Sequence, residues 1–318
     1  MIRYVLVTLV LAAGATLPAR PVTGMAPGGR VLLDAHNCYP YDGRFADRLD
    51  RALATGIPLA IEQDLAWYTD PRTGVARSIV THGEPYTGAE PGMREHFFER
   101  IRPIVETALR ENRTDDWPII TLNLDFKTLE PEHLQAVWTL LGEYESWLTT
   151  AERPATEGTI AVLDVRPVLV LTGDQDEQQA AFDDRVPAGG KLRLFGAIPR
   201  AVKGAPPIAP VRTNYRRWSN NPWSVVEPEG QPKSGSWTPE DEARLVSAVR
   251  AAHDAGLWIR FYTLNGHDPA DVSGGWSVSY NFGSLAAAEE RWRAAIKAGV
   301  DFVAVDQYEA FAKVLKSR

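Results

Sequence analysis

The chain has almost no cysteine. Cys38 is the only one among 318 residues, so no disulfide can form within the chain. The burial of apolar side chains must therefore supply the stability, and 44% of the residues are hydrophobic. No spacing of cysteine and histidine typical of a zinc site is present either.

An excess of positive charge is also missing. The 34 lysines and arginines are outnumbered by 41 acidic residues, and the formal net charge is −7. Proteins that bind nucleic acid usually carry a basic face or stripe, so we expect no nucleic-acid partner. An anionic ligand would need a local positive feature.

Long hydrophobic runs are absent. The most apolar segment, residues 4–14, is shorter than the ~20 residues that a membrane-spanning helix needs. With its positively charged start and the small residues that follow, it resembles a signal peptide. The alternative, a buried N-terminal helix, is disfavoured by Pro18 and Pro21. We expect residues 1–25 to be a signal peptide and linker, and the protein to be secreted or periplasmic.

From residue 31 to residue 306, short runs rich in valine, isoleucine and leucine alternate with longer segments of helical period, which is typical of βαβ units. The eight runs are 31–35, 58–61, 118–124, 167–171, 192–195, 211–216, 257–264 and 302–305. The fifth and sixth runs are the weakest, because their surroundings are polar or rich in proline and glycine. The pattern predicts an α/β protein with one (β/α)8 TIM barrel spanning residues 26–318.

Helices between these runs carry their own signals. Apolar residues recur at helical spacing in residues 45–56, 97–109 and 131–141. Thr238 and Asp241 form a capping box with a proline at the first helical position, and this helix should end near Gly256. A further helix is expected from Ser284 to Gly299.

Polar residues follow the predicted strands at the end where a barrel of this kind carries its chemistry. They are His36, Asn37, Glu62, Gln63, Asp64, Asp125, Lys127, Asn265 and Asp306. A further histidine, His82, ends a β-like stretch at 79–82 that could fold back over the barrel mouth. We therefore expect these side chains to converge at one end of the barrel.

Three carboxylates in this set indicate a metal site. Glu62 and Asp64 are two apart on a strand, so their side chains point to the same face and would repel each other. A hard divalent cation with oxygen ligands would neutralise them, with Asp125 as third ligand. Ca²⁺ and Mg²⁺ both fit such a set. The alternative is that Glu62 and Asp64 are ion-paired barrel residues without a metal.

The other four histidines lie in helical or loop contexts, where we expect ordinary structural or surface roles. They are His96, His133, His253 and His267.

Together, the strand-end residues resemble the phosphodiesterase superfamily that includes glycerophosphodiester phosphodiesterases and phosphatidylinositol-specific phospholipases C. The matching elements, in order along the chain, are His36-Asn37, the Glu62-x-Asp64 pair, His82, the Asp125-x-Lys127 pair, residues 262–265 and residues 299–306. The resemblance spans nearly the whole mature chain, which makes it more specific than any single motif.

Departures from the family pattern concern the substrate more than the reaction class. Asn37 stands where glycerophosphodiesterases carry arginine, and Cys38 stands where they carry glycine. Gly83 replaces a common aspartate, and Asp125 replaces the more usual glutamate with a shorter carboxylate. These differences tilt the resemblance toward the phospholipase C-like side.

The resemblance implies a secreted, metal-dependent phosphoric diester hydrolase with a role in lipid metabolism. It makes His36 and His82 the acid/base pair, with the order of their roles open, and Lys127 a fixed positive charge. A divalent cation on the three carboxylates would act as Lewis acid. The substrate would be a glycerophosphodiester, a phosphoinositide or a related lipid headgroup, and we expect a monomer.

Substrate contacts are expected from the loops at the same end. Asn37, Arg216, Trp218 and Asn265 are the candidates, with Arg216 placed to contact a phosphate. Further loop aromatics are Trp67, Tyr68, Trp223, Trp276 and Tyr280. Their rings could stack on a sugar or inositol ring, make transient contact with a membrane surface, or simply pack the loops together.

Two other functions fit parts of the pattern. Barrels with paired carboxylates and loop tryptophans also include glycoside hydrolases, although these have no use for two strand-end histidines and Lys127. A barrel that holds the metal only to bind a phosphorylated ligand, without catalysis, fits the same residues.

Overall fold

The computed structural model describes residues 25–40, 43–113, 117–200, 210–268, 270 and 278–317. The predicted signal peptide and Trp276 therefore lie outside the described residues. Within these ranges, the structure contains no helix that is both long and apolar enough to cross a membrane.

Eight parallel strands close into a barrel. They are β1 (Leu32–Ala35), β2 (Leu59–Thr69), β4 (Ile120–Phe126), β7 (Val168–Thr172), β9 (Phe195–Ala197), β10 (Arg216–Pro222), β11 (Trp258–Tyr262) and β12 (Phe302–Val305). The sheet closes because β1 pairs in parallel with both β12 and β2. The predicted (β/α)8 barrel is thus confirmed by the strand pairing of the chain itself.

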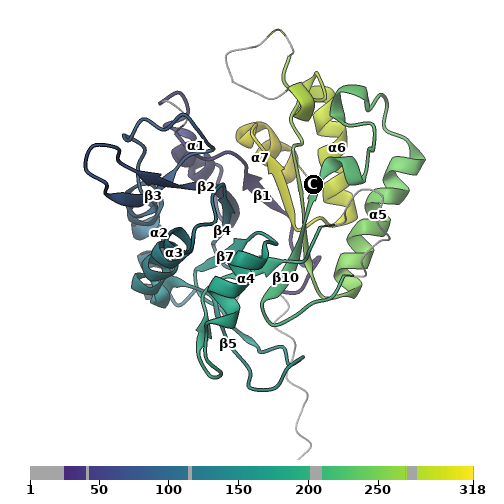
Figure 1. Cartoon of the computed structure of the whole chain (residues 1–318). Coiled ribbons are helices and arrows are strands. Elements are labelled where there is room, and N and C mark those ends of the chain that lie inside the picture. Colours follow the sequence, from purple (N-terminus) through teal and green to yellow (C-terminus); the bar gives the residue numbers. More distant parts are fainter. Residues whose placement is uncertain are drawn as a thin grey trace, which may run out of the picture.

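Helices surround this barrel (Figure 1). They are α1 (Arg48–Ala54), α2 (Glu99–Arg110), α3 (Pro131–Glu143), α4 (Asp176–Gln179), α5 (Pro239–Asp254), α6 (Leu285–Ala298) and α7 (Tyr308–Lys316). The predicted capping box of α5 is present, since Thr238 Oγ1 accepts from the Asp241 amide while the Asp241 carboxylate accepts from the Thr238 amide. α1, α2 and α3 lie on one side of the barrel, and α5 and α6 on the other.

Short elements complete the described chain. β3 (Ala76–Val80) pairs antiparallel with the outer half of β2, and β5 (Thr150–Glu152), β6 (Leu163–Asp164) and β8 (Lys191–Leu192) form a separate small sheet. Short helical turns lie at Arg94–Phe98, Glu145–Trp147, Ala180–Asp184, Trp223–Val225, Gln231–Lys233 and Val278–Tyr280. The β2–β3 hairpin brings the segment before His82 back over the barrel mouth, as the sequence predicts.

Two predicted strands are displaced. The fifth barrel strand is β9, which begins at Phe195, whereas residues 191–192 belong to the small sheet. The prediction for the sixth strand is wrong: residues 211–215 precede it, and β10 begins at Arg216 and continues through polar residues to Pro222. This strand escapes a search for apolar runs because its outer half supplies polar side chains, including that of Asn220, to the barrel mouth.

Candidate active site

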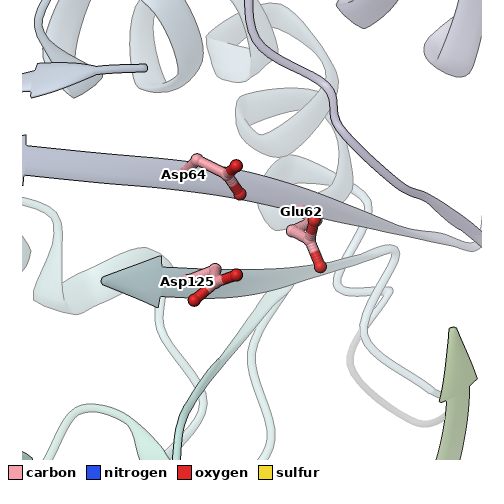
Figure 2. Close-up of side chains that lie close together, drawn as sticks. All are labelled: Glu62, Asp64 and Asp125. Atoms are coloured by element: carbon pink, nitrogen blue, oxygen red, sulfur yellow. The ribbon is translucent and has the colours of Figure 1, made fainter. Parts of the chain in front are cut away.

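Three carboxylates lie together on two neighbouring strands. Glu62 and Asp64 come from β2, and Asp125 comes from β4 (Figure 2). The parallel register places Asp64 directly opposite Asp125. One oxygen from each of the three carboxylates lies within 4.8 Å of the others. The sequence prediction that these groups converge is met by the geometry.

Asp64 is the most deeply buried of the three. Its side chain is fully buried, and neither carboxylate oxygen accepts a hydrogen bond within the described chain. Burial raises the pKa of this carboxyl, the Glu62 charge raises it further, and Lys127 opposes the shift. A buried carboxylate with two oxygens free of hydrogen bonds has the donor set that a divalent cation requires, so the site fits such an ion.

Lys127 is the cation beside this cluster. Its Nζ lies 2.7 Å from Asp125 Oδ2 and 3.3 Å from Asp64 Oδ2. Burial alone would lower the pKa of Lys127, but Asp64, Asp125 and Glu62 together raise it above its usual value. It is therefore a fixed positive charge at the barrel mouth.

Arg260 is a second cation near the carboxylates. It is more deeply buried than Lys127, and the sequence did not lead us to predict it. Its side chain is buried on β11, and Nη2 donates to Glu62 Oε2 at 2.5 Å while Nε donates to the Asp34 carboxylate. Nη1 donates to Asn220 Oδ1 at 3.1 Å. The signal was present in the sequence, because Asp34 and Arg260 are the only charged residues within two otherwise apolar strands. Inside the barrel, Arg260 is thus ion-paired with Asp34 and Glu62.

His36 lies between two acidic groups. Its Nε2 is 3.5 Å from Glu62 Oε1, and its Nδ1 is 3.3 Å from Asp306 Oδ1. Burial alone would lower its pKa, but Glu62 and Asp306 raise the pKa to about 9. The next residue, Asn37, has a left-handed backbone (φ 54°), which turns the chain sharply at the end of β1.

A hydrogen-bond chain fixes the orientation of His36. Asn265 Nδ2 donates to Asp306 Oδ2 at 2.6 Å, and the Asp306 amide donates to Asn265 Oδ1 at 2.9 Å. Asn37 Nδ2 donates to Asp306 Oδ1 at 3.0 Å, and Arg48 Nη1 approaches that oxygen at 3.4 Å. Asn37 and Asn265, predicted as substrate contacts, therefore hold the carboxylate that pairs with His36.

His82 reaches the site from the chain after β3. Its ring lies 5.8 Å from the Tyr39 ring, measured between centroids. Burial lowers its pKa, and the nearby Lys127 lowers it further. The two histidines therefore differ in environment, one between carboxylates and the other beside a lysine.

These groups share one cavity of about 590 Å³ at the barrel mouth. The predicted site residues that line it are His36, Asn37, Glu62, His82, Asp125, Lys127 and Asn265. Asp64 is fully buried at the side of the same carboxylate cluster. Catalytic and metal candidates from separate parts of the chain therefore meet at one place.

The substrate-binding predictions for Arg216 and Trp218 are corrected by the structure. Neither lines the cavity: both lie in the first half of β10, whereas Asn220, further along the strand, does line it. Arg216 Nη1 donates to Ala197 O at 2.7 Å, and the fully buried Trp218 donates through Nε1 to Thr172 O at 2.9 Å. These hydrogen bonds connect β10 to β9 and β7.

Most of the loop aromatics pack the structure. Trp67 stacks on His133, Trp223 is fully buried, and Tyr68 meets Tyr86 edge to face. Tyr280 is the exception, since it lines the cavity and is 45% exposed.

Three of the remaining histidines, His96, His133 and His253, have structural partners, as the sequence suggests. His133 bridges Ser78 Oγ and Thr128 Oγ1, and His253 Nε2 lies 2.9 Å from Asp301 Oδ2. His96 Nε2 lies 3.3 Å from Cys38 O.

The chain matches no known family model and no curated protein sequence. Among solved structures, it is similar to a glycerophosphoryl diester phosphodiesterase from Parabacteroides distasonis, with 12% identity, a TM-score of 0.45, and coverage of 93% of this chain and 90% of the other. A Plasmodium falciparum HPPK-DHPS with pterin and p-hydrobenzoate gives 8% identity and a TM-score of 0.43, over 92% of this chain. This chain spans about half of that protein, covering 48% of its length.

A dihydropteroate synthase from Vibrio fischeri is similar over 91% of this chain and 92% of its own, with 12% identity and a TM-score of 0.37. All three TM-scores lie below 0.5, so these likenesses carry no weight for the chemistry of the site.

Proposed function

We propose that this protein is a metal-dependent hydrolase of phosphoric diesters. The observation that carries the proposal is the convergence of two histidines, three carboxylates and a lysine on one cavity at the barrel mouth. Cleavage of a phosphodiester needs a base for the attacking oxygen, an acid for the leaving oxygen, and positive charge near the phosphate. The cavity supplies candidates for all three.

A divalent cation, Ca²⁺ or Mg²⁺, would be held by Glu62, Asp64 and Asp125. When bound, it supplies Lewis-acid stabilisation of negative charge on the phosphate oxygens. Arg260 donates to Oε2 of Glu62, whereas Oε1 of that carboxylate lies 3.5 Å from His36 Nε2 and accepts from the Asn37 amide at 3.4 Å. Lys127 adds a fixed positive charge at the same edge of the cavity.

The histidines transfer the protons. One imidazole takes the proton of the attacking oxygen while the new P–O bond forms, and the other gives a proton to the leaving oxygen as its P–O bond breaks. Asp306 orients His36 through Nδ1, so that Nε2 faces the cavity and Glu62. With water as the attacking group, the products are a phosphomonoester and an alcohol. With a neighbouring substrate hydroxyl, the first product is a cyclic phosphate.

The substrate class that we propose is a glycerophosphodiester, a phosphoinositide or a related lipid headgroup, cleaved by a monomer after export. The N-terminal apolar segment supports export.

The test is release of p-nitrophenol from bis-p-nitrophenyl phosphate with added Ca²⁺ or Mg²⁺, alongside p-nitrophenyl glycosides. We expect release from the diester only. Release from a glycoside alone would favour the glycoside hydrolase. Binding of a phosphorylated ligand without release of p-nitrophenol would identify a non-catalytic binding barrel. Either of these results would overturn the proposal.

A further inference from the structure

Two neighbouring arginines have no acidic partner among the described residues. Arg212 lies in the segment that precedes β10, and Arg217 lies near the start of that strand. Arg212 packs against the turn between α5 and β11, where a Cβ added to Gly256 would lie 3.0 Å from Nη1. The cavity lies at the other, carboxyl end of the strands, and neither arginine lines it. The pair is therefore separate from the proposed active site.

Arg217 is a buried cation that only neutral groups contact. It is 2% exposed. Its Nε donates to Asn214 O at 2.8 Å, and its Nη2 donates to Asn214 Oδ1 and to Ala161 O, both at 2.9 Å. The guanidinium carbon lies 5.2 Å from the centre of the Phe195 ring. Because buried arginines are usually paired with an acid, the charge of Arg217 lacks its usual compensation.

Arg212 brings a second positive charge to the same place. It is half-buried, and its Nε is enclosed without a hydrogen-bond partner, whereas its two terminal nitrogens are not enclosed. Burial lowers the pKa of Arg212, and burial together with the charge of Arg212 lowers the pKa of Arg217 to about 9. No acidic group in the described chain offsets either shift. An added anion would relieve the repulsion between the two cations.

The carboxyl end of α5 does not replace such an anion. The last carbonyls of a helix attract a cation, but here the carbonyls of residues 251–253 already accept from the backbone amides of residues 255–257. The nearby carboxylate of Asp254 is paired with Arg250 Nε at 3.5 Å. Within the part of the chain that the structure describes, none of these groups accepts from Arg212, so its guanidinium is available to a ligand.

We infer that Arg212 binds an oxyanion through its terminal nitrogens, with Arg217 adding positive charge from the protein interior. A guanidinium donates paired, charge-assisted hydrogen bonds to phosphate and carboxylate groups. Val162 and Val211, which adjoin Ala161 and Arg212 in the sequence, are 88% and 65% exposed. An oxyanion with an apolar chain, such as a lipid headgroup, would find apolar surface beside the charge, and a free phosphate offers the same charged group.

Inorganic phosphate is the first probe. Thermal unfolding of chelator-treated protein is measured in sodium phosphate and in sodium chloride of equal ionic strength, so that the difference in Tm reports binding to the folded chain. We expect phosphate to raise the Tm of the wild-type protein. In Arg212→Met, the apparent Kd for phosphate should rise by about 10-fold or more, because charge-assisted hydrogen bonds are lost.

Two control variants locate the bound phosphate. Arg250→Met removes an exposed arginine near the same end of α5 and should keep the phosphate effect. Lys127→Met removes a cation at the barrel mouth and should also keep it. If Lys127→Met lost the effect and Arg212→Met retained it, phosphate would bind at the barrel mouth and the inference would be overturned.

The Tm in sodium chloride separates ligand binding from a packing role. Arg212 donates no side-chain hydrogen bond within the described chain, so Arg212→Met should unfold in chloride at the wild-type Tm or above it. Arg212→Gln, which is also neutral, carries the test if Arg212→Met does not fold. A lower Tm in chloride with an unchanged phosphate effect would show that Arg212 only packs the turn, and would overturn the inference.

Sedimentation with phosphatidylcholine vesicles, with and without phosphatidate, identifies the source of the oxyanion. Phosphatidate-dependent binding of the wild-type protein that Arg212→Met loses would assign a lipid headgroup. An Arg212-dependent phosphate effect without vesicle binding would assign a soluble oxyanion. If the wild-type protein responded to neither probe, the inference would fail. None of these measurements involves turnover, so their outcome is independent of the proposed hydrolysis.

Discussion

The guanidinium of Arg260 donates a 2.5 Å hydrogen bond to Oε2 of Glu62 in the centre of the barrel. The same guanidinium is paired with Asp34, so one buried cation bridges two buried carboxylates from different strands. Breaking a buried ion pair on one side leaves an uncompensated charge. This relationship links the stability of the barrel to the position of a proposed metal ligand.

Arg260→Met should therefore destabilise the protein by about 3–5 kcal/mol, because Asp34 and Glu62 would lose their shared partner. Urea denaturation followed by circular dichroism measures the change. Arg51→Met is the control, since the Arg51–Glu309 pair is exposed and should contribute less than about 1 kcal/mol. Equal losses in the two variants would show that the Arg260 network does not stabilise the barrel.

His36→Gln and His82→Ala should each lower kcat on bis-p-nitrophenyl phosphate by about 100-fold or more, the low end of general acid/base effects. His253→Gln, at a histidine paired with Asp301 and outside the cavity, should keep the wild-type rate. A folded His36 or His82 variant that retains the wild-type rate would remove that histidine from the mechanism.

Gln231 supports a strained backbone at the cavity. Thr263 has φ 72°, an unfavourable conformation for a β-branched residue, and Gln231 Nε2 donates to its O at 2.8 Å and its Oγ1 at 2.6 Å. Gln231→Leu should cost about 1–3 kcal/mol of stability, because two buried acceptors lose their donor. The same denaturation experiment on Gln135→Leu, a substitution on the exposed face of α3, should show a change below about 0.5 kcal/mol. If Gln231→Leu were as stable as Gln135→Leu, Gln231 would not stabilise the backbone of Thr263.

The free energy of unfolding should fall as the pH is lowered below about 6.5, in part because the unfolded chain protonates His133 more readily than the folded protein does. Burial lowers the pKa of His133 to about 4, whereas the unfolded chain takes up a proton near the usual value of 6.5. Its contribution is therefore complete above pH 6.5 and is lost between pH 6.5 and about 4, at no more than about 1.4 kcal/mol per pH unit.

Denaturation of wild-type protein and of His133→Gln across this pH range isolates the effect. The variant should show a shallower loss of stability with falling pH, even if it is less stable at neutral pH. Parallel pH profiles would mean that His133 does not titrate as its burial implies.

The barrel could be predicted from the sequence because its signals are local. Apolar runs mark β1, β4, β7 and β12 to within about two residues, and Thr238 with Asp241 marks the start of α5. The strand ends also identified the three carboxylates and His36, since parallel strands bring their carboxyl ends to one mouth. His82 instead follows the antiparallel strand β3.

What could not be predicted depends on pairing across the barrel. Arg260 and Asp34 are far apart in the chain, and only the closed sheet shows that Arg260 pairs with both Asp34 and Glu62. β10 was misplaced because its polar outer half hides the strand pattern.

The most direct test of the metal site is isothermal titration of chelator-treated protein with Ca²⁺ and with Mg²⁺. We predict one bound ion per chain in the wild-type protein, and loss of that binding in Asp64→Asn, because Asp64 offers two buried oxygens that accept no hydrogen bond within the described chain. Absence of binding of both ions, or an undiminished affinity in Asp64→Asn, would contradict the account.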